Sequence, residues 1–155
     1  MTPTPARLHE LLQRQHDTAH RLLELLDQEQ AALSDNRLQD LDRIVAAKQQ
    51  HLSELDAAAR EYLVAAPDKA ALIRMLRGAD PRGTLGLELR WRQLETLLRQ
   101  CQDQNSVNGK IIHLGQRRTR QALSILRSGD AGTGPCYTPT GTATAAATSR
   151  TLGKV

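Results

Sequence analysis

The chain has 155 residues, enough for one domain of ordinary size, and almost no aromatic side chains: one Trp, two Tyr and no Phe. Leu and Ala dominate its apolar residues, which favours helices over strands, so we expect an all-α protein. The two cysteines lack a CxxC spacing and predict neither a disulfide framework nor a zinc site. No apolar run reaches the roughly 20 residues that span a membrane, and the N-terminus lacks the apolar core of a signal peptide, so a cytoplasmic location is expected.

The net charge of +4 is unevenly distributed along the chain. Residues 1–66 carry 11 acidic and 7 basic side chains, whereas residues 67–155 carry 6 acidic and 14 basic ones. A basic half invites a nucleic-acid interpretation. Pairing of the two halves within one bundle is favoured instead, because the aromatic side chains that stack on single-stranded bases are missing.

Two long helices of about 29 residues each are expected over residues 5–33 and 37–65. Leucines recur in both segments at alternating spacings of three and four, as in a heptad pattern. Thr4 followed by Pro5 predicts the first helix start, Ser34-Asp35-Asn36 separates the helices, and Pro67 ends the second. Similar lengths, roughly 43 Å each, and a short loop predict an antiparallel hairpin.

A short helix is expected over residues 67–78, then a loop, then one long helix over roughly residues 84–127. Its apolar seam keeps 4-3 spacing from Leu87 to Leu126. At roughly 66 Å this helix is more than about 20 Å longer than its partners. The expected fold class is therefore all-α, an elongated antiparallel bundle of three long helices and one short helix.

The segment CQDQNSVNGKII, residues 101–112, places poor helix formers inside the long helix. Asn-Gly is a strong hairpin signal, but the heptad phase continues through it, so a continuous helix is favoured over a kink at Asn108-Gly109. Cys101, Asn105 and Asn108 then lie on the buried seam, where the amides set helix register through specific partners. Gly109 would let another backbone approach closely, at a cost of about 1 kcal/mol relative to Ala.

After Arg127 the chain changes character. Residues 128–155 are rich in Gly, Thr, Ala, Ser and Pro, with few large apolar side chains. Such a segment cannot bury enough surface to fold alone. The predicted organisation is therefore a helical bundle domain over residues 1–127 and a flexible tail over residues 128–155.

No catalytic constellation emerges from the sequence. His16 and His20 share a helix face but have no evident third ligand, and no P-loop, GxSxG or GxGxxG motif occurs. Carboxylates in the first helix alternate with arginines, which fits surface ion pairs better than an acid–base pair. We expect no enzyme activity, no cofactor and no metal.

Three features occur together in this chain. They are the leucine-rich hairpin with AAKQQHL at 46–52, the string W-x-x-L…C-x-x-x-N-x-x-N-G-x-I-I from Trp91 to Ile112, and a tail with Tyr137 and Gly141. Together they resemble the FlgN-type flagellar export chaperones over essentially the whole chain. The C-x-x-x-N-x-x-N-G segment is the specific part. The family's tail motif is usually Tyr-Gly-x-x-Gly, whereas this sequence has Tyr137-Thr-Pro-Thr-Gly141 and lacks the first Gly.

The resemblance implies a cytoplasmic chaperone of the flagellar type III export system. Such a chaperone binds the C-terminal helical segments of hook–filament junction proteins, keeps them unassembled and delivers them to the export gate. Tyr137 and Gly141 would dock on that gate. The resemblance implies no nucleotide, no metal and no membrane insertion.

We expect the client helix to lie against the C-terminal half of the long helix, because the shorter hairpin cannot cover all of it. The apolar side chains there lie on more than one face of the helix, which suits packing against two neighbouring segments rather than one. The expected client-binding residues are Ile111, Ile112, Leu114, Ala122, Leu123, Ile125 and Leu126.

Two other classes of function stay open. One is a generic coiled-coil scaffold or homodimer, in which the end of the long helix pairs with its own copy. The other, less favoured, is nucleic-acid binding through Arg117, Arg118, Arg120 and Arg127. Phosphate binding would fall by orders of magnitude between low and moderate salt, whereas helix-in-groove binding would barely change.

Overall fold

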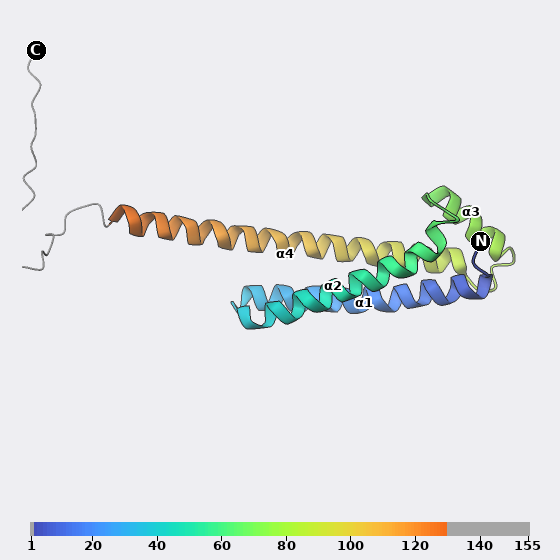
Figure 1. Ribbon diagram of the computed structural model, residues 1–155, viewed down its shortest axis with the longest axis horizontal. Coiled ribbons are helices and arrows are strands. Elements are labelled where there is room, and N and C mark those ends of the chain that lie inside the picture. The colour runs from blue at the N-terminus through green and yellow to red at the C-terminus, as the bar shows by residue number, and fades with distance from the viewer. Residues whose placement is uncertain (1, 130–155) are drawn as a thin grey trace, which may run out of the picture. The chain divides into compact units, whose positions relative to one another are not determined.

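The computed structural model describes residues 2–129 of the 155 and contains four helices in that range. They are α1 (Pro5–Ser34), α2 (Leu38–Leu63), α3 (Lys69–Ala79) and α4 (Leu87–Gly129), and the described residues contain no strand (Figure 1). The predicted all-α fold of three long helices and one short helix is confirmed.

The chain divides into two units, Met1–His113 and Leu114–Val155. The first contains α1, α2, α3 and the part of α4 up to His113, and the described part of the second is helical. The predicted flexible tail of residues 128–155 lies almost wholly outside the described residues. No helix within residues 2–129 is long and apolar enough to cross a membrane.

Side-chain caps mark the starts of α1 and α3, and a residue in the left-handed region turns the chain between α1 and α2. The Thr4 hydroxyl accepts a hydrogen bond from the Arg7 backbone N–H at 3.3 Å, and Pro5 occupies the first helical turn. The loop between α1 and α2 turns through Asn36 in the left-handed region, at φ 55°. The Asp68 carboxylate caps α3 by accepting from the Ala71 N–H at 2.7 Å.

Within the first unit, α2 runs antiparallel to α1, and α4 runs parallel to α1. The start of α1 meets the end of α2 where the Arg7 guanidinium pairs with the Glu61 carboxylate at 2.8 Å. Hydrogen bonds join α1 to α4 in the same chain order, through the pairs Gln13–Arg90, Ala19–Cys101 and Leu26–Asn108. The short α3 lies at the end of the hairpin where α1 begins (Figure 1).

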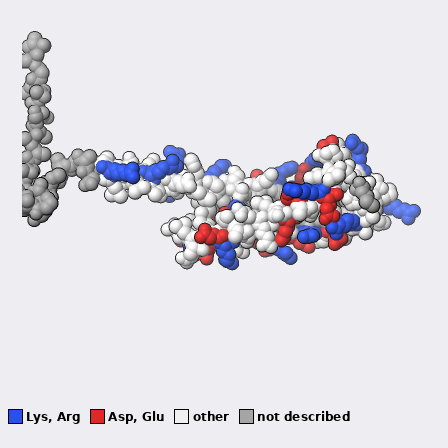
Figure 2. Space-filling view, viewed as in Figure 1, with Lys and Arg blue, Asp and Glu red and all other residues white. Residues whose placement is uncertain are grey.

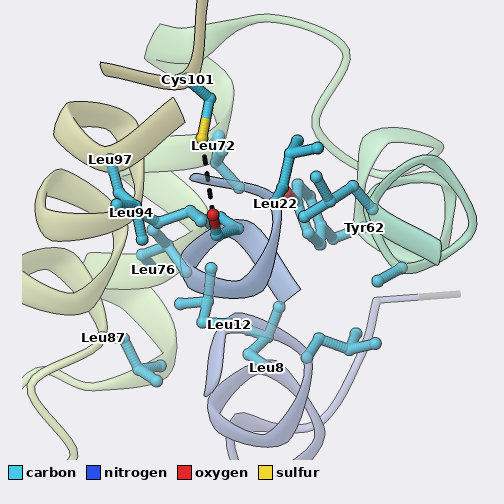
Figure 3. Close-up of a cluster of buried hydrophobic side chains, with 14 of the residues drawn as sticks. Leu8, Leu12, Leu22, Tyr62, Leu72, Leu76, Leu87, Leu94, Leu97 and Cys101 are labelled. Atoms are coloured by element: carbon cyan, nitrogen blue, oxygen red, sulfur yellow. Dashed lines mark hydrogen bonds between the residues drawn. The ribbon is translucent and has the colours of Figure 1, made fainter. Parts of the chain in front are cut away.

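Leucine side chains from all four helices form the core of this unit. Figure 3 shows Leu8 and Leu12 of α1 facing Leu76, Leu87 and other side chains of α3 and α4. The rings of Tyr62 and Trp91 meet edge to face with centroids 6.3 Å apart. The Tyr62 hydroxyl donates a hydrogen bond to the Gln15 side-chain oxygen at 3.0 Å. Burial raises the pKa of Tyr62, and this hydrogen bond offsets only part of the rise. The expected seam of leucines and small residues is therefore present.

The long helix starts at Leu87, three residues later than predicted. The Asp80 carboxylate accepts hydrogen bonds from the backbone N–H groups of Leu85 and Leu87, at 3.1 and 3.4 Å. Gly83 and Gly86 have φ of 67° and 62°, outside the right-handed helical region. These contacts hold residues 80–86 as a loop. Downstream, α4 continues as helix through Asn108-Gly109.

Candidate functional site

A hydrogen-bonded polar layer joins α1, α2 and α4 inside the first unit. The Glu29 carboxylate accepts from the Lys48 ammonium at 3.0 and 3.1 Å. Asn108 Nδ2 donates to Glu29 Oε2 at 2.7 Å and to the Leu26 carbonyl at 2.9 Å. Lys48 Nζ also donates to Asn105 Oδ1 at 2.8 Å. Glu29 of α1 and Lys48 of α2 thus form an ion pair, and two side chains of α4 bond to it: Asn108 to the carboxylate and Asn105 to the ammonium group.

This layer suits a role in setting helix register. Asn108 is 1 % exposed, and the Glu29 and Lys48 side chains are 4 % and 19 % exposed. Sliding α4 along α1 would separate Asn108 from Glu29 and leave a buried carboxylate short of a donor, which is costly. Register selection by Cys101, Asn105, Asn108 and Gly109 stays a prediction.

Cys101 lies one α-helical turn before Asn105 and belongs to the leucine core. It is 5 % exposed, and its Sγ lies 3.4 Å from the Ala19 carbonyl, the contact drawn as a dashed line in Figure 3. Burial raises the pKa of the Cys101 thiol, and the negative charge of Asp27 raises it further. The thiol is therefore protonated at neutral pH and is a core residue rather than a nucleophile.

Two of the predicted register residues differ from expectation. Asn105 is exposed rather than buried, although its side chain bonds to Lys48. It lies at the edge of the helix–helix contact, whereas Asn108 lies inside it. A Cβ built at Gly109 would meet no other atom within 4 Å, so no backbone of the described chain makes the expected close approach there.

Replacing Gly109 by Ala is therefore expected to raise the free energy of unfolding by about 0.5–1 kcal/mol. Alanine loses less conformational entropy in a helix interior, and the site has room for its methyl group. Urea unfolding monitored by circular dichroism measures the change. A destabilised Gly109→Ala variant would show that another backbone approaches this glycine after all.

The predicted client-binding residues lie late in α4, and nearly all are exposed. In the first unit, Ile111 is half-buried and Ile112 is 40 % exposed. In the second unit Ala122 is exposed, and four large side chains are 49–70 % exposed: Leu114, Leu123, Ile125 and Leu126. Large apolar side chains exposed together mark an interaction surface more often than scattered single ones do.

The helix of the second unit is strongly two-sided. At 3.6 residues per turn, all five apolar residues just named in this unit fall on about one half of the helix circumference. Arg117, Arg120 and Arg127 fall on the other half, and Arg118 lies within the apolar arc. Residues 114–129 contain no acidic side chain, and Figure 2 shows basic side chains along this end of α4. We name the apolar half the α4 apolar face.

The predicted gate-docking residues and the histidine pair of the first helix lie apart from these features in the sequence. Tyr137 and Gly141 lie outside the described residues. The His16 and His20 rings lie 5.5 Å apart between centroids, but no group of three His, Cys, Asp or Glu side chains within residues 2–129 is placed to hold a metal.

The pairing of Glu29 with Lys48 was not predicted from the sequence. A signal for it was present, because both residues interrupt the apolar seams of their helices. Counting outward from the loop does not give the pairing, because Glu29 lies six residues before residue 35 whereas Lys48 lies eleven residues after residue 37.

These features define a helical-bundle protein that carries an exposed amphipathic helix. A protein-family model described as FlgN protein matches residues 1–145, so the chain belongs to the FlgN family. No curated protein and no solved structure matches it significantly. FlgN proteins are flagellar export chaperones rather than enzymes, and that is the general role of this chain.

Proposed function

We propose that this protein binds the C-terminal helical segments of hook–filament junction proteins, keeps them unassembled in the cytoplasm and delivers them to the flagellar type III export gate. Membership of the FlgN family supports the class of client. The observation that carries the proposal is the α4 apolar face, whose large side chains are 49–70 % exposed. The proposed client-binding residues also include Ile111 and Ile112, which precede residue 114 in the sequence.

Helix-in-groove binding explains how such a face would protect a client. The terminal segment of a subunit that later packs into a filament is amphipathic, and its apolar stripe self-associates when exposed. Laying that stripe along the α4 apolar face removes both surfaces from water. Arg118 lies within the apolar arc and can pair with acidic side chains of the client.

Delivery to the export gate rests on the resemblance in the tail. Tyr137 and Gly141 are proposed to dock there, since they correspond to the ends of the family's tail motif. The Tyr137→Ala variant tests this part separately, because it leaves residues 114–126 unchanged. Gate binding that is undiminished in this variant would remove the docking proposal without affecting the client site.

Hydrogen exchange with and without client tests where the client binds. The full chain is incubated with the C-terminal helical segment of a junction protein, and amide exchange is followed by mass spectrometry. We expect slower exchange across residues 114–128, since this helix has few packing contacts to protect it in the free chain. The α1–α2 hairpin, which already packs against a leucine core, should change less.

The matched control is the same segment with its apolar stripe replaced by Asp. It should leave exchange at residues 114–128 unchanged. Protection confined to the hairpin, with no change at residues 114–128, would place the client elsewhere.

A further inference from the structure

A second unpartnered apolar surface lies in the first unit, between α2 and α4 and above α1. It is a groove of about 350 Å³ whose apolar lining comes from Leu22, Leu26, Leu52, Leu55, Leu98 and Cys101. Leu22 and Leu26 form its buried floor, at 4 % and 1 % exposed. We name it the α2–α4 groove.

The α2 rim of this groove continues as a line of exposed apolar side chains. Leu38, Val45 and Leu52 follow one another at seven-residue spacing and are 63 %, 42 % and 51 % exposed. Heptad spacing on an exposed helix face is the pattern of a helix that packs against another helix. From Leu38 to Leu52 the line is about 21 Å long at 1.5 Å per residue.

The helix of residues 114–128 matches this line in length and chemistry. It too spans about 21 Å, and one half of its circumference is apolar and exposed. It carries four arginines and no acidic residue, whereas α2 carries five acidic and three basic side chains. Asp42 and Asp56 are exposed and stand four residues after Leu38 and Leu52, on the same face of α2 as the apolar line. Apolar surface would thus meet apolar surface, and Arg118, which lies within the apolar arc, would meet an aspartate of α2.

We propose that residues 114–128 of one chain dock along the α2–α4 groove of a second copy, and that the exchange is reciprocal in a homodimer. A closed two-fold arrangement uses both complementary surfaces of each chain and leaves neither exposed. This contact would cover the α4 apolar face. If the client binds that face, as the proposed function holds, client and second copy compete, and the dimer is a resting state that protects the chaperone's own apolar surface.

Sedimentation velocity of the full chain over a range of concentrations tests the proposal. We expect a reversible dimer that weakens as salt screens the arginine–aspartate pairs. The groove variants Leu52→Asp and Val45→Asp, and the helix variant Leu123→Asp with Leu126→Asp, should each raise the dimer dissociation constant by at least about tenfold. Leu89→Asp is the matched control: Leu89 is 62 % exposed and stands nine residues before Leu98, on the opposite side of α4, so dimerisation should be unchanged.

Mixing the variants gives a sharper result. Leu52→Asp keeps an intact helix 114–128, and the Leu123→Asp, Leu126→Asp chain keeps an intact groove. One of the two contacts can therefore form only in a mixed dimer, which should be more stable than either variant's own dimer. A wild-type chain that is monomeric up to its solubility limit would overturn the proposal. So would a dimer that is insensitive to both groove variants, since that result would indicate pairing of helix with helix.

Client binding separates this proposal from the proposed function. Leu52→Asp should still bind the client segment, and more tightly than the wild type, because the competing copy is removed. A monomeric wild type that binds client refutes only the dimer. A groove-dependent dimer that binds no client refutes only the client site. Circular dichroism of each variant confirms that the helices remain folded.

Discussion

Replacing Lys48 by Met is expected to lower the free energy of unfolding by about 3 kcal/mol. The Lys48 ammonium is the charge partner of Glu29, whose side chain is 4 % exposed. Removing the cation leaves a buried carboxylate supported by the Asn108 amide alone, and an uncompensated buried charge costs about 3–5 kcal/mol. Asn105 loses its Lys48 contact in the same variant, but it is exposed and can bond to water.

The double variant Lys48→Met with Glu29→Met should recover most of the lost stability, because it removes both charges from the layer. Lys69→Met is the matched control. Lys69 pairs with Glu95 on the surface and is 60 % exposed, so its loss should cost no more than about 1 kcal/mol. Urea unfolding of the four proteins measures these differences. Equal costs for Lys48→Met and Lys69→Met would contradict the buried layer.

Replacing Leu123 and Leu126 together by Asp is expected to weaken client binding at least about 100-fold. Burying each leucine contributes about 1.5–3 kcal/mol, and about 1.4 kcal/mol corresponds to a tenfold change in affinity. Both side chains are exposed in the free chain, at 49 % and 69 %, so the change should not unfold the bundle. Calorimetric titration with the client segment measures the loss.

Gln121→Asp with Ser124→Asp is the matched control for this pair. It adds the same two negative charges to the same helix, on the half opposite the α4 apolar face. Affinity should therefore change little. Similar losses in both double variants would show that charge, rather than the apolar contact, determines binding, and an unchanged Leu123→Asp, Leu126→Asp variant would place the client site elsewhere.

The helices themselves were predictable because their evidence is local. Leucine spacing predicted the three long helices, and Thr4 followed by Pro5 marked the start of α1, which the structure confirms. The continuity of α4 through Asn108-Gly109 followed from the unbroken heptad spacing. If the chain turned there, the apolar residues after Gly109 would have no reason to keep the same 4-3 spacing. The low helix propensity of Asn108 and Gly109 was too small an effect to interrupt a helix of 43 residues.

Features that depend on tertiary contacts were harder to predict. The start of α4 is set by the Asp80 carboxylate, which reaches backbone groups five and seven residues ahead, and no helix propensity encodes that loop. A heptad pattern identifies a stripe but not its edges, so Asn105 and Asn108 were expected to be equally buried although only Asn108 is. The α2–α4 groove depends on how three helices splay apart, which no single helix specifies.

The most direct test of the proposed function is a calorimetric titration of the wild-type chain with the C-terminal helical segment of a hook–filament junction protein. We predict saturable binding, with a negative heat-capacity change from the apolar surface that is buried. A segment of equal length from the middle of the same junction protein serves as the control and should not bind. Absence of binding to the C-terminal segment, or equal binding of both segments, would contradict the claim that this chain is a chaperone for junction-protein termini.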